Sequence, residues 1–212
     1  MTRQSEQALE YILVKKLKFT HQDIEKLNKF HDELLKYNKK YNLISKSTEN
    51  ELWSRHILDS AQIVNFIDFK QSHSLSDLGT GAGFPGIVLS IFNKNNKFHV
   101  KLYEKSKIKC DFIRKIIDKL NIYCNLYEND YQYHQIDSNY IVCRAFKKLP
   151  ELLRISREIV KKSHKLIILK GKNAQEEVNN LSKEMIYKYR LEKSITNNEL
   201  GILIVDVIKK SE

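Results

Sequence analysis

Glycines are concentrated in one short segment of this chain, where they could bring the backbone close to a ligand. Four of the six glycines lie within residues 77–86, whose sequence is DLGTGAGFPG. Residues 74–78 read as a strand, and a helix is expected to begin near Gly86. Glycine adopts positive φ angles readily, and the first turn of a helix leaves N–H groups free for a negatively charged group. The segment therefore predicts a cofactor-binding turn.

Two classes of cofactor fit such a turn. Residues 81–86 match the dinucleotide pattern GxGxxG, and Glu104 lies at the distance expected for a ribose-binding acid. S-adenosylmethionine (SAM) fits better, because Asp77 is a poor neighbour for a pyrophosphate but a good one for the methionine ammonium group, directly or through water. The Phe84-Pro85 pair also stiffens a loop that dinucleotide folds keep small and flexible. We expect SAM, with S-adenosylhomocysteine as product; a glycine-rich turn without a ligand is the remaining alternative.

Two further positions at strand ends could complete a SAM pocket. Glu104 ends the second expected strand, where its carboxylate could accept hydrogen bonds from both ribose hydroxyls. Asn129 and Asp130 follow the third expected strand and are placed to meet the adenine edge. Each has a plain structural alternative: a surface acid among lysines for Glu104, and an ordinary turn signal for the Asn-Asp pair.

The elements that position these residues follow from the spacing of apolar side chains. The first 70 residues read as helices, with a capping box at Thr20 and Asp23 and a third helix capped by Ser47 or Thr48. From residue 74 onward, strands and helices alternate, which predicts a parallel sheet covered on both faces. Strands are expected at 74–78, 98–104, 123–127, 139–144 and 165–169, and helices at 86–92, 107–120, 149–160 and 173–187.

The C-terminal pattern indicates the fold class. Residues 188–195 and 200–208 read as two strands of a hairpin. An α/β fold whose parallel sheet ends in an antiparallel hairpin resembles the Rossmann-like, seven-stranded fold of class I SAM-dependent methyltransferases. We therefore expect residues 71–212 to form a methyltransferase domain and residues 1–70 a helical extension packed on it, as a single compact unit. Likeness of fold alone supports function only weakly.

Net charge indicates the kind of partner. The chain has 37 Lys and Arg against 26 Asp and Glu, a formal charge of +11. Such an excess of positive charge favours an anionic partner, either nucleic acid or an acidic membrane surface. The alternative is that the charge reflects compositional drift and has no binding role. No apolar run approaches the roughly 20 residues of a membrane span, and the N-terminus lacks a signal-peptide pattern. We expect a cytoplasmic protein without a membrane partner. Cys110, Cys124 and Cys143 show neither a disulfide nor a zinc pattern, so no metal is expected.

The end of the fourth expected strand, residues 141–146, usually faces the methyl acceptor in this fold. It carries neither the Asn/Asp-Pro-Pro-aromatic motif that holds exocyclic amino groups nor the Pro-Cys pair of pyrimidine C5 methylation. The acceptor should therefore need little chemical assistance.

Five segments together resemble one family. They are 41–43 (YNL), 55–60 (RHILDS), 77–86, 144–146 (RAF) and 169–171 (LKG), in order and at family-like spacing. Over about residues 35–175 the chain resembles the ribosomal RNA small subunit methyltransferase G family, also called glucose-inhibited division protein B. The resemblance implies transfer of a methyl group from SAM to N7 of one guanine in 16S rRNA, either free or within the 30S subunit.

The resemblance also implies, by position, which residues line the SAM pocket. They are Gly79, Phe84, Asn129, Asp130 and Arg144, with Asp77, Gly81 and Glu104 beside them. Two positions depart from the family pattern. Ile44 stands where Thr is common, and Glu128 stands where Arg is frequent, which bears on any RNA or cofactor contact at that point.

Methylation at guanine N7 needs no general base, because the N7 lone pair carries no proton. Arg144, Lys170 and His56 are candidates for positioning the guanine, as cations or aromatic rings on which a splayed base can stack. Structural alternatives are a buried core histidine for His56 and a helix ion pair with Asp59 for Arg55.

Exposed basic residues could hold the rRNA phosphates, which would give affinity without sequence choice. The candidates are Lys36, Lys39, Lys40 and Arg55, with a second set at residues 105–119; solvated helix faces are the alternative. We expect a monomer. Two other functions stay open: a non-catalytic rRNA-binding assembly factor with this fold, and a SAM-dependent methyltransferase of another substrate.

Overall fold

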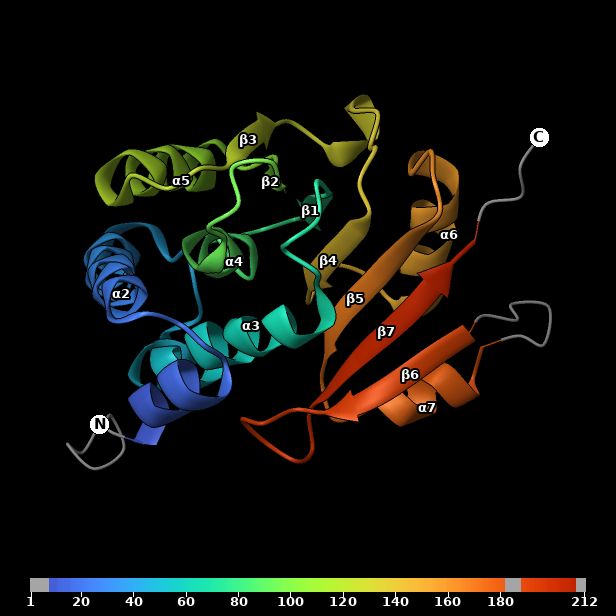
Figure 1. The fold of residues 1–212 in the computed structure, drawn as a ribbon, viewed down its shortest axis with the longest axis horizontal. Helices are drawn as coiled ribbons and strands as arrows, with labels where there is room; N and C mark the ends of the chain where they lie inside the picture. Colours follow the sequence, from blue (N-terminus) through green and yellow to red (C-terminus); the bar gives the residue numbers. More distant parts are fainter. Residues whose placement is uncertain (1–7, 182–187, 209–212) are drawn as a thin grey trace.

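A seven-stranded mixed sheet forms the centre of the protein (Figure 1). The structure, a computed structural model, describes residues 8–181 and 188–208. Strand order is β3-β2-β1-β4-β5-β7-β6, with β1 to β5 parallel and β7 and β6 antiparallel to their neighbours. The strands are β1 (Ser74–Leu78), β2 (His99–Glu104), β3 (Asn125–Glu128), β4 (Tyr140–Arg144), β5 (His164–Lys170), β6 (Lys188–Lys193) and β7 (Gly201–Val207).

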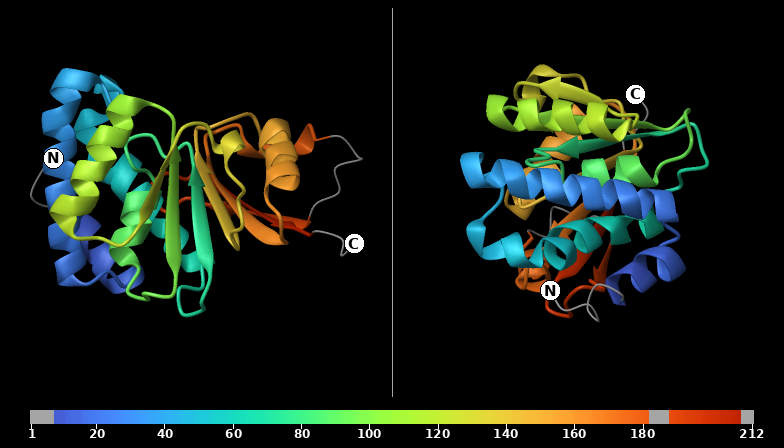
Figure 2. Two further views of the ribbon diagram at one scale, coloured as in Figure 1. Left: turned by 90° about the horizontal axis from the view of Figure 1, so that it is seen from above. Right: turned by 90° about the vertical axis from the view of Figure 1, so that its left-hand side faces the viewer.

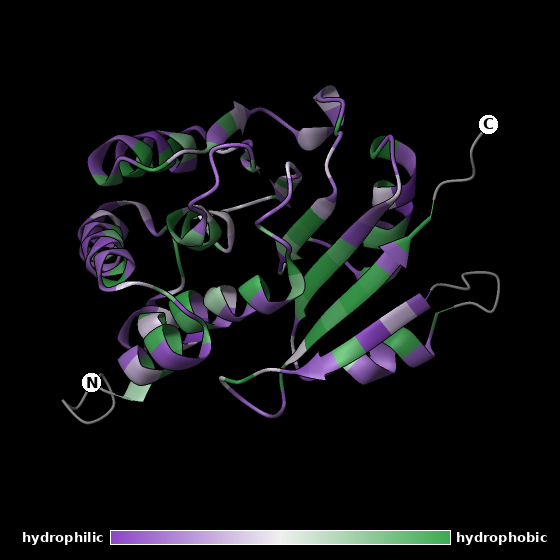
Figure 3. Cartoon of the chain, in the orientation of Figure 1, coloured by the Kyte–Doolittle hydropathy of each residue, from purple (hydrophilic) through white to green (hydrophobic). Residues whose placement is uncertain are grey.

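Helices cover both faces of this sheet (Figure 2). One face carries α2 (His21–Tyr41), α4 (Gly86–Phe92), α5 (Lys107–Leu120) and the short helical turns of residues 46–66, and the other carries α6 (Leu149–Ile159) and α7 (Ala174–Asn179). The β4 and β5 residues alternate between two apolar clusters, since Val142 and Ile167 pack on the first face while Ile141 and Ile168 pack on the second. Apolar colouring follows these inner faces (Figure 3). The predicted class I methyltransferase fold is confirmed.

Local signals account for most element boundaries. The capping box at the start of α2 is confirmed, because the Thr20 side chain accepts from the Asp23 N–H and the Asp23 side chain accepts from the Thr20 N–H. Helix α2 ends at Tyr41, and the capping residue Asn42 adopts the left-handed conformation that asparagine tolerates. Helices α4 and α5 match their predicted ranges residue for residue.

The predicted third helix forms, but not as one regular α-helix. Residues 46–66 are consecutive short helical segments with different hydrogen-bonding patterns: η2 (Lys46–Glu51), η3 (Trp53–Leu58), α3 (Asp59–Ala61) and η4 (Gln62–Phe66). Neither Ser47 nor Thr48 caps a helix here, because the Thr48 hydroxyl donates to the Ser45 carbonyl and contacts His56 instead. The last predicted helix is shorter than expected, since α7 ends at Asn179; residues 182–187 lie outside the described part of the chain.

The N-terminal helices share one apolar cluster with the sheet. Side chains of the first 70 residues, such as Leu27 and Phe30, belong to the same buried cluster as Val100 on β2 and Ile204 on β7. The division at residue 70 stays a prediction, and this shared core supports our proposal that both parts form a single unit. All three cysteine thiols are free. Within the described residues, no helix is long and apolar enough to cross a membrane.

Candidate active site

The glycine turn leaves β1 and enters α4 in a conformation that requires glycine. Gly79 has a φ of +68° and Gly81 a φ of +63°, in the left-handed region that L side chains rarely adopt. A Cβ atom at Gly79 would also overlap the ring of Phe146, which lies against the turn. The turn is therefore fixed by backbone geometry and by the close approach of Phe146.

Asp77 holds this turn from inside the protein. Its Oδ2 accepts hydrogen bonds from the Thr80 hydroxyl at 2.5 Å and from the Gly86 N–H at 2.8 Å. Its Oδ1 is buried and has no hydrogen-bond partner among the described residues. Burial raises the pKa of Asp77 to about 7. Asp77 thus connects both ends of the turn and leaves one acceptor that a donor group on a ligand would satisfy.

A cavity of about 330 Å³ lies beside the turn, and we call it the smaller cavity. Five predicted residues line it: Gly79, Gly81, Glu104, Asn129 and Asp130. Aromatic side chains that the sequence reasoning had not assigned complete its walls, namely Tyr103, Tyr131 and Phe146. Their only signal in the sequence was their position directly at or after strand ends.

Glu104 has most of its acceptor capacity occupied. Its Oε2 accepts from the Gly81 N–H at 2.9 Å, and its Oε1 accepts from the N–H groups of Lys105 and Ser106. A carboxylate offers about four lone-pair sites, so roughly one is left for a ribose hydroxyl. Binding both hydroxyls, as predicted, would require Glu104 to release the Gly81 N–H.

Phe84 is not among the residues that line the smaller cavity. Its side chain is buried and packs against Phe30 and His56, with ring centroids 5.1 Å away in each case. Glu128, the position that departs from the family pattern, also points elsewhere: it pairs with Arg114 of α5 at 2.9 Å. Ile44, the other departure, is buried in the apolar core.

A second cavity of about 870 Å³ adjoins the first, and we call it the larger cavity. Ala145, Phe146 and Lys147 line both, so the start of the β4–α6 loop separates the two. Ala145 has a φ of +45°, which is uncommon for a residue other than glycine. The charged side chains around the larger cavity are Arg55, Asp59, Arg144, Lys147, Lys148, Lys170 and Glu177.

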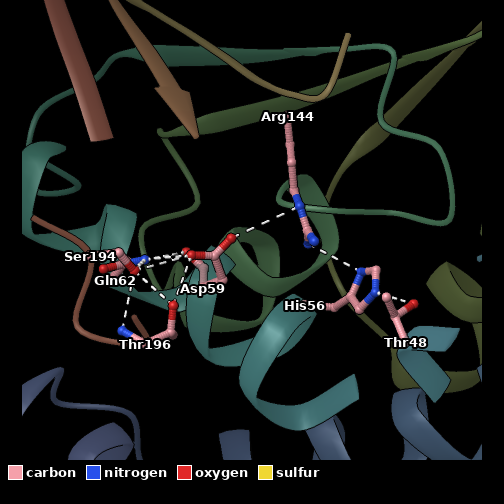
Figure 4. A network of polar contacts seen from close by, with 7 residues as sticks. All are labelled: Thr48, His56, Asp59, Gln62, Arg144, Ser194 and Thr196. Carbon is pink, nitrogen blue, oxygen red and sulfur yellow. Dashed lines mark hydrogen bonds and ion pairs between the residues drawn. The ribbon is translucent and has the colours of Figure 1, made fainter. Parts of the chain in front are cut away.

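Arg144 lines the larger cavity and is held there by two side chains (Figure 4). Its Nη1 lies 3.1 Å from Nδ1 of His56, and its Nε lies 3.9 Å from Oδ2 of Asp59. Burial, and then the charge of Arg144, lower the pKa of His56 to about 3, so the imidazole is neutral at pH 7. Because a guanidinium group can only donate, Nδ1 accepts and Nε2–H donates to Thr48 at 3.0 Å.

Two more of the predicted positioning and RNA-binding residues, Lys170 and Arg55, line the larger cavity together with Arg144. Lys170 lines the larger cavity but pairs with Glu177 at 2.6 Å. Arg55 also lines it and pairs with Glu51 at 3.5 Å, so the ion pair with Asp59 that was its structural alternative does not form. Asp59 turns instead toward Arg144, because its own helical segment faces the end of β4.

The lysines of α2 lie away from both cavities, on an exposed stretch near the end of the helix. Lys36 is 3.1 Å from the buried Glu33, which also contacts Lys115 and Lys119 of α5. The hydrogen bond from Lys119 is the largest influence that lowers the pKa of Glu33 to about 2. Lys39 and Lys40 are exposed.

Comparison with known proteins decides the family. The family model described as "rRNA small subunit methyltransferase G" matches residues 23–202. The chain belongs to this family. It is 35% identical over 190 residues to the methyltransferase of that name from Rickettsia bellii, covering 90% of this chain and 96% of the relative. It is 36% identical over 205 residues to that from Pelagibacter ubique, covering 94% and 96%.

Solved structures agree on the fold of this family member. A SAM-dependent methyltransferase from Aquifex aeolicus superposes with a TM-score of 0.59 at 14% identity, covering 82% of this chain and 98% of that one. The family confirms the prediction of a SAM-dependent rRNA methyltransferase. The smaller cavity fits SAM, because it has acidic side chains, aromatic walls and a glycine turn. Asp77, which holds that turn, is buried behind it and is not among the lining residues.

Proposed function

We propose that this protein transfers a methyl group from SAM to N7 of a guanine in small subunit rRNA. The observation that carries the proposal is the adjacency of the two cavities, which share Ala145, Phe146 and Lys147. The smaller one would hold SAM through Gly79, Gly81, Glu104, Asn129 and Asp130, and the larger one would hold the acceptor base. When bound, SAM supplies a methyl group on a positively charged sulfur and leaves as S-adenosylhomocysteine.

The protein's part in this reaction is to orient the base and to exclude a competing acceptor. No proton leaves N7, so no general base is required. His56 could not act as one in this arrangement, because its Nδ1 already accepts from Arg144 and its Nε2 donates to Thr48. Rate enhancement would come from in-line alignment of N7 with the methyl group across the shared loop.

Binding to the rRNA would use positive charge outside the cavities. Arg55 at the rim of the larger cavity and the exposed Lys39 and Lys40 of α2 are suited to phosphate contacts, while Lys36 is partly neutralised by Glu33. We propose a cytoplasmic monomer without a membrane partner.

Mapping 7-methylguanosine in 16S rRNA from cells with and without the gene tests the function. We expect one guanine to lose its methyl group on deletion, and an unchanged map would refute the proposal. Tritiated-methyl transfer to purified 30S subunits and to naked 16S rRNA would then identify the preferred form of the substrate.

The alternative function, a non-catalytic assembly factor, predicts a different outcome in binding and methyl-transfer assays. It would bind rRNA and show no methyl transfer, whereas for the enzyme we expect SAM binding in calorimetric titration together with methyl transfer. A SAM-dependent enzyme of another substrate would methylate neither form of the rRNA, and its activity would not respond to salt in the way that phosphate contacts require.

A further inference from the structure

We propose that Arg144 selects guanine at the acceptor site by donating a hydrogen bond to O6, and that His56 and Asp59 are positioning residues that hold its guanidinium group for this contact. The proposal rests on the proposed guanine-N7 function and names how the same site would recognise its base. Three observations support it: the contacts of Arg144 with His56 and Asp59, the N–H groups of Arg144 that have no partner among the described residues, and the acceptor that guanine presents next to N7.

Arg144 is restrained on two sides but keeps donors for a ligand. One Nη1–H donates to Nδ1 of His56, and Nε faces Asp59 (Figure 4). Among the described residues, the hydrogens on Nη2 have no hydrogen-bond partner, and the side chain, 21% exposed, lines the larger cavity. A donor edge in fixed orientation therefore remains available to whatever enters this cavity.

The supports of Arg144 are themselves fixed by segments far apart in the sequence. Oδ1 of Asp59 accepts from Gln62 at 2.8 Å and from the hydroxyls of Ser194 and Thr196 at 3.3 and 3.4 Å. The last two residues lie in the connection between β6 and β7, which brings the terminal hairpin into the site. All three donors act on Oδ1, so Oδ2 is left to face Arg144.

On the other side, a chain of hydrogen bonds fixes the histidine. His56 donates from Nε2 to Thr48, and the Thr48 hydroxyl donates to the Ser45 carbonyl. This direction of donation leaves Nδ1 with a lone pair toward Arg144. The two supports therefore act together: one accepts a hydrogen bond and the other supplies a negative charge.

The free N–H groups of Arg144 can distinguish guanine from adenine. Guanine presents an O6 acceptor next to N7, whereas adenine presents an amino donor at the same place. A side chain that can only donate is compatible with guanine and leaves an unpaired donor facing adenine. Donation to O6 alone keeps the N7 lone pair free to react. Asp59 offsets the charge of Arg144, which would otherwise oppose the positive charge that N7 acquires.

The test combines a protein variant with a substrate variant. Methyl transfer is measured on 30S subunits assembled with guanosine, or with 2-aminopurine riboside, which lacks O6, at the mapped target position. For the wild type we expect kcat/KM to fall roughly ten- to a hundred-fold on removal of O6, the size of one directional hydrogen bond to a base edge. For Arg144→Met, which removes the donors at similar volume, we expect a further fall of less than about three-fold. An equal fall in both proteins would overturn the proposal.

SAM affinity separates this role from a role in cofactor binding. We expect Arg144→Met to bind SAM within about two-fold of the wild type in calorimetry, because its side chain lines the larger cavity and not the smaller one. Loss of SAM binding in a variant that melts like the wild type would overturn the placement of Arg144 at the acceptor. If the wild type fails to methylate the guanosine-containing subunit, the proposed function itself fails, which is a distinct result.

The positioning residues are tested by the same discrimination ratio. Asp59→Asn and His56→Leu should reduce the ratio between the two substrates about ten-fold, while His56→Asn, which keeps an acceptor for Arg144, should restore most of it. Glu158→Gln removes the same charge from an exposed pair with Arg154 on α6 and serves as the control. Unchanged ratios in Asp59→Asn and His56→Leu would show that the network only stabilises the fold.

Discussion

The smaller and larger cavities lie side by side but are built in different ways. The smaller one depends on backbone: a turn of left-handed glycines, the N–H of Gly81 bound to Glu104, and a buried carboxylate at Asp77 that ties the turn to α4. The larger one depends on side chains brought from three distant segments, the turns of residues 46–66, the end of β4 and the β6–β7 connection.

This difference in construction suits the two cavities to two tasks, cofactor binding and acceptor recognition. A cavity made of backbone is specified by a short stretch of sequence and suits a cofactor common to many enzymes with this fold. A cavity made of side chains on separate elements can be changed one residue at a time, and so suits recognition of a particular acceptor. Substitutions in the two cavities should therefore damage different measurable quantities.

The largest effect is expected from the glycine turn. Gly79→Ala should weaken SAM binding about a hundred-fold, because a Cβ there is strained by its positive φ, at roughly 1–2 kcal/mol, and also overlaps Phe146. Gly81→Ala, whose Cβ would meet only the Gly79 carbonyl at 3.9 Å, should weaken it about ten-fold. Calorimetric titration measures both, and equal losses would remove Phe146 from the explanation.

The buried carboxylate of Asp77 should lower the free energy of unfolding near neutral pH, although its hydrogen bonds hold the glycine turn. Its pKa is raised from 3.8 to about 7 by burial, so the folded state holds a proton that the unfolded state releases. The protonated carboxyl of Asp77 therefore adds to the free energy of unfolding. This contribution is fully present below pH 3.8 and is lost as pH rises through 7, by up to about 4 kcal/mol. Asp77→Asn should therefore gain stability over the wild type between pH 5 and 8 in urea unfolding, yet bind SAM about ten-fold more weakly. A constant difference between the two proteins across this range would contradict the assignment.

His56 should give the opposite pH dependence in the larger cavity. Its pKa is lowered to about 3 in the folded state from 6.5, so protonation favours the unfolded chain. Stability is fully present above pH 6.5 and is lost as pH falls toward 3, by about 2 kcal/mol at pH 5. His56→Asn should flatten this acid limb in thermal melting. An acid limb of unchanged slope in the variant would show that another group is responsible.

The smallest effects lie outside both cavities. The triple variant Lys36→Gln, Lys39→Gln and Lys40→Gln should reduce the slope of log affinity for rRNA against log salt by about 0.7–0.9 for each phosphate that is no longer neutralised. SAM affinity should not change. Lys161→Gln, an exposed lysine after α6, is the control. The slope itself distinguishes direct binding of phosphates from a general effect of net charge, which would make every lysine equivalent.

The sequence predicts the smaller cavity better than the larger one for the same structural reason. Five predicted pocket residues line the smaller cavity because each lies at the end of a parallel strand, and such ends meet along one edge of the sheet. Phe84 is not among the lining residues, because its ring is buried against Phe30 and His56, and its predicted contact with SAM stays a prediction. The role of each lining residue in holding SAM stays a prediction.

The sequence predicted only some of the residues that form the larger cavity. Arg144 and Lys170 could be selected as strand-end cations, and both line it. The contact of Asp59 with Ser194 and Thr196 spans most of the chain, and no periodicity or motif indicates it. In the same region the sequence predicted a helix but neither its division into short segments nor the contact of Thr48 with His56 in place of a helix cap.

The loop that divides the cavities has a consequence for mutational tolerance. Ala145 adopts a left-handed backbone and lines both compartments. A β-branched residue there would be strained in this conformation and would narrow the cofactor and acceptor spaces together. Among the residues that line the two cavities, only Ala145, Phe146 and Lys147 line both. At Ala145 a single nucleotide change can compromise both, so this position should be among the least variable in any population of functional genes.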